Sequence, residues 1–177
     1  MGLAHWGLLP PWTQTDDKAS CAKMINARSE TVAEKPAFRQ AWESGRRCLI
    51  PASGFFEWKT DEKAGVNQPY YIADANESCL AFAGLWNKTG NLVTFTILTK
   101  DADGPIVTLH HRMPVILKPG QAAAWFAATP DDAMHMIKAA SGAGLFYHPV
   151  GSAVGKVAND DPSLLEKAQP LASGLLF

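Results

Sequence analysis

A glutamate within an aromatic run is the most distinctive candidate for chemistry in this 177-residue chain. The run Gly54-Phe55-Phe56-Glu57-Trp58 is predicted to form a strand, on which Glu57 shares a face with Phe55 while Phe56 and Trp58 point the other way. Apolar neighbours remove water from a carboxylate and raise its pKa, which suits Glu57 to proton transfer near neutral pH. The alternative is an exposed glutamate on an edge strand.

A second group of ionisable side chains lies in the run Leu109-His110-His111-Arg112-Met113-Pro114. Histidine titrates near physiological pH, so His110 is a candidate general acid or base. Arg112 is a candidate bidentate donor to a phosphate. The alternative is a solvated turn before the next strand. No metal site is predicted, because adjacent histidines on a strand face opposite sides and no third ligand is suitably spaced.

A third candidate is the polar run Asn26-Ala27-Arg28-Ser29-Glu30-Thr31, which offers an amide, a guanidinium and hydroxyls without apolar periodicity. The alternative here is a plain loop with a helix cap. GxGxxG, P-loop, GxSxG and HExxH motifs do not occur in the sequence. Nucleotide binding, serine-hydrolase chemistry and zinc proteolysis therefore have no motif support.

The three cysteines show no CxxC and no zinc-type spacing, so neither a disulfide framework nor a zinc site is predicted. A reducing compartment is expected. Cys48, in an apolar run, is predicted to be an inert core thiol, and Cys79 is interpreted in the same way. Cys21 lies in a polar stretch and is a candidate for exposure.

The composition is that of a globular protein, with 47% hydrophobic and 19% charged residues, which excludes disordered, collagen-like and coiled-coil chains. The length predicts one domain over residues 1–177. A net charge of −1 argues against a strongly basic coat for nucleic acid but allows a local basic groove. No signal peptide and no apolar run near the ~18 residues of a membrane span is found, so the cytoplasm is expected. The six tryptophans suggest that some rings lie in a partly exposed cleft.

Short strands dominate the elements that must position these residues. Apolar runs and turn residues predict strands over 47–51, 55–58, 70–73, 80–83, 92–98, 113–117 and 145–150. Helices are predicted over 35–45, 121–127 and 130–140, and a loop over 13–25. In the strand over 92–98, Val93, Phe95 and Ile97 alternate with threonines, as in a half-buried strand. Without βαβ alternation, the fold class is α+β, with a mostly antiparallel, barrel-like β-sheet flanked by a few helices.

Taken in order, five stretches over about residues 5–166 resemble the SRAP family, the SOS-response-associated peptidase domain of abasic-site processing proteins. The stretches are Trp6-Gly7-Leu8-Leu9-Pro10-Pro11-Trp12, the run over 26–31, Arg47-Cys48-Leu49-Ile50-Pro51 continuing to Trp58, Ala81-Phe82-Ala83-Gly84-Leu85-Trp86, and the run over 110–117. Near the end, Val154 with Asn159-Asp160-Asp161-Pro162 is similar to the closing motif of the family.

The resemblance implies binding to single-stranded DNA or DNA junctions with abasic sites, and a covalent thiazolidine crosslink to the ring-opened sugar through an N-terminal cysteine. It implies catalytic roles for Asn26, which positions the nucleophile or sugar, Glu57, which shuttles protons, and His110, which acts on the opened sugar. It implies that Arg28 and Arg112 bind phosphates and that Thr99 makes a polar contact with the DNA backbone. It also implies that Trp12 and Trp58 stack on unpaired bases. No cofactor or metal is implied, and a cytoplasmic monomer that joins the nucleoid on damage is expected.

Two departures from the family bear on function. The second residue is Gly2 instead of the family's cysteine, and the few dozen residues that the family carries before the Trp-Gly-Leu motif are not present in this sequence. His111 replaces a residue that is usually acidic or polar. Three hypotheses follow: a crosslinking protein whose full-length form carries the cysteine, a non-catalytic remnant that binds single-stranded DNA, and a hydrolase or peptidase that uses Glu57 and His110.

Overall fold

The backbone divides into two compact units, each assembled from three separate stretches of chain. The computed structural model describes residues 3–13, 18–61, 65–76 and 78–171. The first unit consists of Met1–Pro51, Ala81–Asp101 and Arg112–Ser141. The second unit consists of Ala52–Leu80, Ala102–His111 and Gly142–Phe177. The single domain over residues 1–177 stays a prediction.

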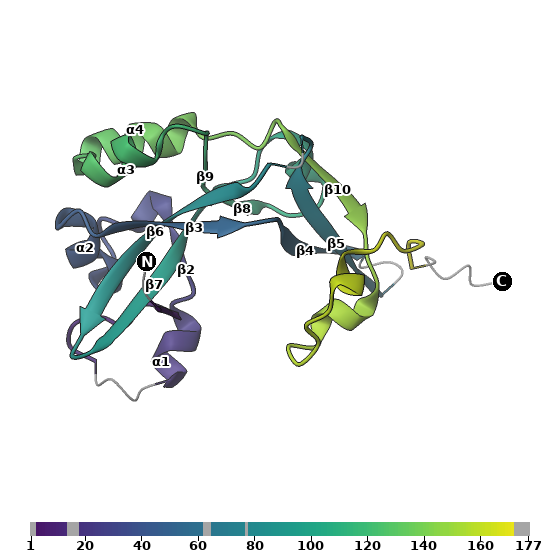
Figure 1. Cartoon of the computed structure of the whole chain (residues 1–177), viewed down its shortest axis with the longest axis horizontal. Coiled ribbons are helices and arrows are strands. Elements are labelled where there is room, and N and C mark those ends of the chain that lie inside the picture. The colour runs from purple at the N-terminus through teal and green to yellow at the C-terminus, as the bar shows by residue number, and fades with distance from the viewer. Residues whose placement is uncertain (1–2, 14–17, 62–64, 77, 172–177) are drawn as a thin grey trace. The chain divides into compact units, whose positions relative to one another are not determined.

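Strand β7 (Leu92–Asp101) organises the sheet of the first unit, because four other strands pair with it. Strand β6 (Leu80–Thr89) runs antiparallel to β7 in a long hairpin (Figure 1), and Gly90 in its turn has a φ of 59°, which favours glycine. Strands β1 (His5–Trp6) and β2 (Asn26–Arg28) run parallel to β7. The other strands of this sheet are β3 (Arg47–Ala52), beside β6, β8 (Arg112–Pro114), antiparallel to β7, and β9 (Ile116–Leu117), antiparallel to β6.

Two helices of the first unit hold a buried arginine between their tryptophans. Helix α2 (Pro36–Glu43) buries Trp42, and helix α3 (Ala122–Ala127) buries Trp125. The guanidinium of Arg47 lies 5.3 Å from the centre of the Trp42 ring and 5.6 Å from that of Trp125. Cation–π attraction therefore links β3 to both helices.

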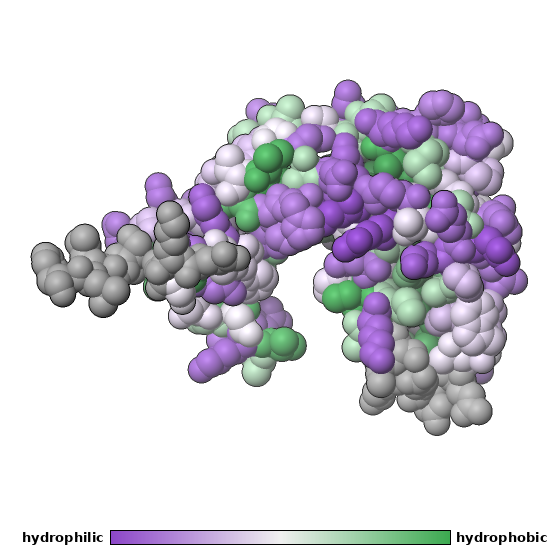
Figure 2. Space-filling model, turned by 180° about the vertical axis from the view of Figure 1, so that it is seen from behind, coloured by the Kyte–Doolittle hydropathy of each residue, from purple (hydrophilic) through white to green (hydrophobic). Residues whose placement is uncertain are grey.

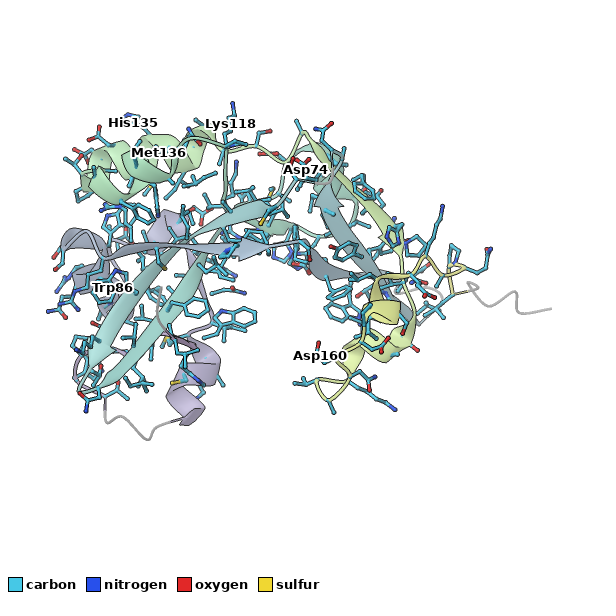
Figure 3. The ribbon with its side chains drawn as sticks, viewed as in Figure 1. Asp74, Trp86, Lys118, His135, Met136 and Asp160 are labelled. Carbon is cyan, nitrogen blue, oxygen red and sulfur yellow. The ribbon has the colours of Figure 1, made fainter. Side chains whose placement is uncertain are left out.

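Helix α4 (Pro130–Ala139) completes the core of the first unit. Its start was predictable, because Thr129 caps it: the threonine hydroxyl accepts a hydrogen bond from the backbone N–H of Asp132 at 3.2 Å. Ile137 is buried, and Met136 packs against the core while His135 points away from it (Figure 3). The short helix α1 (Lys18–Lys23) also belongs to this unit.

The second unit contains a three-stranded antiparallel sheet in the order β10-β5-β4, so β4 is an edge strand. Its strands are β4 (Phe55–Asp61), β5 (Val66–Asp74) and β10 (Leu145–Pro149). Three 3-10 helices accompany it, η2 (Gly104–Thr108), η3 (Ser152–Gly155) and η4 (Pro162–Leu165). A small core of Tyr71, Ala73 and Val150 packs with Phe56 and Val154.

The α+β class with mostly antiparallel strand pairs is confirmed, and within the described residues the larger sheet is open instead of closed into a barrel. One local prediction is wrong. The stretch 13–25 contains α1, in which Cys21 is buried, although residues 14–17 lie outside the described residues. Strand β7 is half-buried, and its threonines lie on the more buried face, with Thr94 and Thr96 both 0% exposed. The Thr94 hydroxyl accepts the N–H of Leu9 at 3.0 Å, which satisfies it there.

The face of the molecule in Figure 2 is mostly hydrophilic, with hydrophobic residues in small separate patches. Within the described residues, no helix combines the length and the apolar character that crossing a bilayer requires. Of the apolar tail over residues 171–177, only Leu171 lies within the described residues.

Candidate active site and DNA-contact residues

Glu57 is a half-buried carboxylate on the edge strand β4. Its side chain is 24% exposed, and in the pairing of β4 with β5 it lies opposite Tyr70. Burial raises the pKa of the Glu57 carboxyl, and the positive charge of a protonated His110 opposes this to a lesser extent. Both interpretations of Glu57 thus hold in part: it stands on an edge strand, and its pKa is nevertheless raised.

His110 follows the 3-10 helix η2 and faces Glu57 within the second unit. The backbone N–H of His110 donates to the carbonyl of Ile106 at 3.0 Å, and His110 Nδ1 lies 3.5 Å from Glu57 Oε1. The His111 ring lies 4.4 Å from the His110 ring, centre to centre. The expectation that the two rings face opposite sides is wrong, because the residues precede β8 and the alternation of a strand does not apply to them.

The arrangement suits proton transfer. A carboxyl with a raised pKa remains protonated closer to neutrality, and an imidazole beside it can accept or return the proton. The separation of 3.5 Å exceeds an ordinary hydrogen bond, and such contacts between catalytic groups commonly tighten when substrate binds. The structure therefore brings together two of the three residues that the sequence proposes as catalytic, Glu57 and His110.

Arg112, in the first unit, is engaged by carboxylates of its own chain. Its Nη1 and Nη2 donate to Oε1 and Oε2 of Glu30, each at 2.8 Å. Nη1 also donates to Oδ1 of Asp101 at 2.6 Å, and Nη2 donates to the carbonyl of Thr99 at 2.8 Å. The guanidinium lowers the pKa of Glu30, and the two carboxylates raise the pKa of Arg112. Phosphate binding by Arg112 stays a prediction and requires competition with these carboxylates.

Strand β2 presents Asn26 and Arg28 on one face, since both are exposed while Ala27 between them is buried. The plain-loop alternative is therefore wrong for these residues. Arg28 lies opposite Thr99 in the parallel pairing with β7, so Arg28, Thr99 and Arg112 stand on the adjacent strands β2, β7 and β8. Asn26 belongs to the first unit, and its convergence with the two catalytic candidates of the second unit stays a prediction.

The tryptophans divide into exposed and buried rings, as their number suggests. Trp12 is 65% exposed, and Trp58 on β4 is half-buried. Trp6 is 49% exposed, stacks on Phe95 with ring centres 6.5 Å apart, and donates its indole N–H to the Ile25 carbonyl at 2.8 Å. Rings at the surface of each unit are thus available for base stacking, a role that stays a prediction for Trp12 and Trp58.

Cys48 fits its prediction and Cys79 does not. Desolvation raises the pKa of the Cys48 thiol to about 12, so this thiol is inert near neutral pH. Cys79 is exposed, and its thiol lies 3.5 Å from the carbonyl of Ala52. Among the described residues, no three His, Cys, Asp or Glu side chains are grouped so as to hold a metal ion.

Sequence reasoning misses the carboxylate partners of Arg112. Glu30 stands within the polar run over 26–31, but nothing in the spacing connects it with an arginine 82 residues further on. Asp101 lies at the end of a strand and carries no motif signal. A hollow of about 540 Å³ borders this network in the first unit, lined by Ser29, Glu30, Lys100, Asp101, Met134, Ile137 and Lys138.

Comparison with known proteins decides the family. The SRAP family model, described as SOS response associated peptidase, matches residues 1–157. The chain belongs to the SRAP family. This SRAP chain is 38% identical over 175 residues to the abasic site processing protein YoqW of Bacillus subtilis, covering 94% of this chain and 76% of YoqW. It is 34% identical over 190 residues to the abasic site processing protein HMCES of Gallus gallus, covering 91% of this chain and 55% of HMCES.

Solved structures share the backbone arrangement of this SRAP chain. A protein from Bacteroides thetaiotaomicron matches with a TM-score of 0.80 at 26% identity, covering 93% of this chain and 75% of that one. A protein from Bordetella bronchiseptica matches with a TM-score of 0.73 at 30% identity, covering 84% of this chain and 76% of that one. The resemblance drawn from the five sequence stretches is thereby confirmed, and so is the α+β fold class.

Proposed function

We propose that this SRAP chain binds DNA that contains abasic sites and processes those sites, with Glu57 and His110 as the proton-transfer pair. The main support for this proposal is the 3.5 Å distance between Oε1 of the half-buried Glu57 carboxyl and Nδ1 of the His110 imidazole. The similarity to YoqW and HMCES, both named abasic site processing proteins, supports the substrate. A ring-opened abasic sugar carries an aldehyde, and additions to an aldehyde and their reversal need a positioned proton donor and acceptor.

The proposed DNA is single-stranded, or a junction between single and double strands. Arg28 is the principal phosphate contact, because it is exposed and forms no ion pair within the described part of the chain. Thr99 contacts the backbone, Trp12 and Trp58 stack on bases, and Asn26 orients the sugar or the nucleophile. We propose a monomer without cofactor, located in the cytoplasm and at the nucleoid after damage.

Covalent capture is proposed for a form of the protein that begins with cysteine. The α-amino group adds to the aldehyde, water leaves to give an imine, and the thiol adds across the C=N bond to close a thiazolidine. Glu57 donates the proton that lets the hydroxyl leave as water. His110 takes a proton from the opened sugar, which supports reversal of the linkage or strand scission.

The test compares oligonucleotides that differ at one position. The full chain is mixed with single-stranded DNA carrying an abasic site, a reduced abasic site without the aldehyde, or an intact nucleotide, and affinity and products on denaturing gels are measured. We expect preferential binding of abasic DNA, and cleaved product only where the aldehyde is present. Cleavage should be lost in Glu57→Gln and retained in the exposed control Glu34→Gln. Equal binding of all three DNAs without product, or cleavage of a peptide substrate instead, overturns the proposal.

A further inference from the structure

We propose that Tyr147 and Thr108 are positioning residues that hold His110 at Glu57, through a hydrogen bond between their hydroxyls that ties η2 to β10. The inference rests on the proposed function of the Glu57–His110 pair. Thr108 Oγ1 lies 2.9 Å from the Tyr147 hydroxyl oxygen. Thr108 is the last residue of η2, and His110 follows it after Leu109 alone, so a contact that restrains Thr108 also restrains the backbone of His110.

The direction of this hydrogen bond follows from the hydrogens available. The Thr108 hydroxyl donates to the carbonyl of Pro105 at 2.9 Å. A threonine hydroxyl has one hydrogen, so Tyr147 is the donor in the bond between the two hydroxyls and Thr108 is the acceptor. Replacing tyrosine by phenylalanine therefore removes the donor, and Thr108 cannot supply another hydrogen.

Tyr147 is itself held by the sheet that carries Glu57. Its ring packs edge-on against the Tyr70 ring, with centres 5.4 Å apart and planes at 89°. Tyr70 lies opposite Glu57 in the pairing of β5 with β4. Tyr147 thus packs against the cross-strand neighbour of Glu57, and its hydroxyl bonds to Thr108, two residues before His110. One tyrosine therefore contacts the surroundings of both members of the pair.

A hydrogen bond also joins the beginning of η2 to the segment that precedes β10. The Asp103 carboxylate accepts the backbone N–H of Gly142, and Gly104 has a φ of 58°. A Cβ on Gly104 would approach the backbone of Gly142 to 2.9 Å, so the two segments pass in close contact. Side-chain hydrogen bonds thus fix both ends of η2: Asp103 bonds to Gly142 at its beginning, and Thr108 bonds to Tyr147 at its end.

The Glu57 carboxyl provides a readout that does not depend on DNA. A protonated His110 lowers the pKa of Glu57, so we expect that pKa to rise when His110 moves away while Glu57 stays buried. Titratable groups near the pair include His111, against the His110 ring, and Tyr70, opposite Glu57. Carbon-13 NMR of glutamate side-chain carboxyls, with the Glu57 signal assigned through Glu57→Gln, follows this titration directly.

The experiment compares Tyr147→Phe, Thr108→Val, their combination and His110→Ala. We expect each single variant to reproduce at least half of the upward shift in the Glu57 midpoint that His110→Ala produces, and the double variant to add nothing, because both remove the same bond. The matched control is Thr60→Val, which removes a hydroxyl bonded to Asn67 at 3.2 Å on the same sheet. Processing of abasic DNA should fall about tenfold in Tyr147→Phe, with unchanged affinity.

If the midpoint of the Glu57 titration in both Tyr147→Phe and Thr108→Val equals that of the wild-type protein, the positioning role is overturned. If the midpoint shifts as expected while no variant and no wild-type protein acts on abasic DNA, the positioning role stands and the proposed function fails. If Tyr147→Phe does not fold by circular dichroism, Thr108→Val decides alone, because Thr108 is exposed and its replacement leaves the packing of Tyr147 in place.

Discussion

Arg112 and Glu30 meet through two parallel hydrogen bonds, each 2.8 Å long, which join strand β8 to the 3-10 helix η1 (Ser29–Thr31) directly after β2. The Arg112 side chain is 12% exposed and that of Glu30 45%, so the pair is desolvated mainly on the side of the arginine. Because η1 continues from the strand that bears Asn26 and Arg28, the pair restrains the segment that presents both candidate functional residues.

Glu30→Gln is expected to destabilise the protein at pH 7 by about 1 kcal/mol, a value in the range of partly exposed ion pairs. Arg112 holds the pKa of Glu30 below its usual value, so this stabilisation is present above the unfolded pKa and is lost as the pH falls through the folded one. Urea unfolding at pH 7 and pH 3 should show a larger difference at pH 7 than at pH 3. Exposed Glu34→Gln is the control, and an equal loss at pH 3 would exclude the ion pair as the cause.

Arg28→Ala is expected to weaken binding to single-stranded DNA and to flatten its salt dependence. Removal of one phosphate contact reduces the slope of log K against log salt by about 0.7 on single strands. Fluorescence anisotropy at several salt concentrations measures both effects. Arg39→Ala, which removes an exposed arginine from α2 of the same unit, should leave both unchanged. Unaltered affinity in Arg28→Ala would argue against β2 as a DNA-contact strand.

Glu57→Gln is expected to reduce processing of abasic DNA by about 100-fold or more, the usual effect of losing a general acid–base group. The same change should stabilise the fold at pH 8. Burial raises the pKa of Glu57, so its charged form is penalised in the folded state, and the penalty grows as the pH rises from the unfolded pKa through the folded one. Thermal melts at pH 3 and pH 8 test the sign; a Glu57→Gln protein that melts lower than wild type at pH 8 would contradict it.

Gly54→Ala is expected to destabilise the second unit by about 1–3 kcal/mol, as overpacking does. A Cβ at Gly54 would lie 2.4 Å from the carbonyl oxygen of Ile72 and 2.5 Å from the Tyr71 ring, both on β5. Gly151→Ala is the matched control, since a Cβ there meets nothing within 4 Å. Chemical denaturation gives the free energy of unfolding of both variants, and the difference between them isolates the effect of close packing at Gly54 from that of replacing a glycine. Equal free energies of unfolding would show that the backbone at Gly54 shifts to accommodate the methyl group.

Helix caps, turn residues and apolar runs predicted most helices and strands, because these elements depend on residues close together in the sequence. The threonine cap and following proline predicted α4, and apolar runs between turn residues predicted most strands of both sheets. The alternation on β7 did not indicate which face is buried, because that depends on a distant partner. Thr94 is buried because Leu9 supplies the N–H that satisfies its hydroxyl, and no rule of alternation contains that information.

Short stretches of the sequence were enough to predict the family, the α+β class and the candidate residues, because motif order, turn chemistry and apolar spacing are local properties. Which side chains come into contact could be seen only in the folded chain. The contact of Glu57 with His110, the carboxylates on Arg112 and the bond of Thr108 to Tyr147 depend on strand order and register. Those are set by the packing of segments far apart in the chain, and a carboxylate acquires its pKa from the neighbours that this packing supplies.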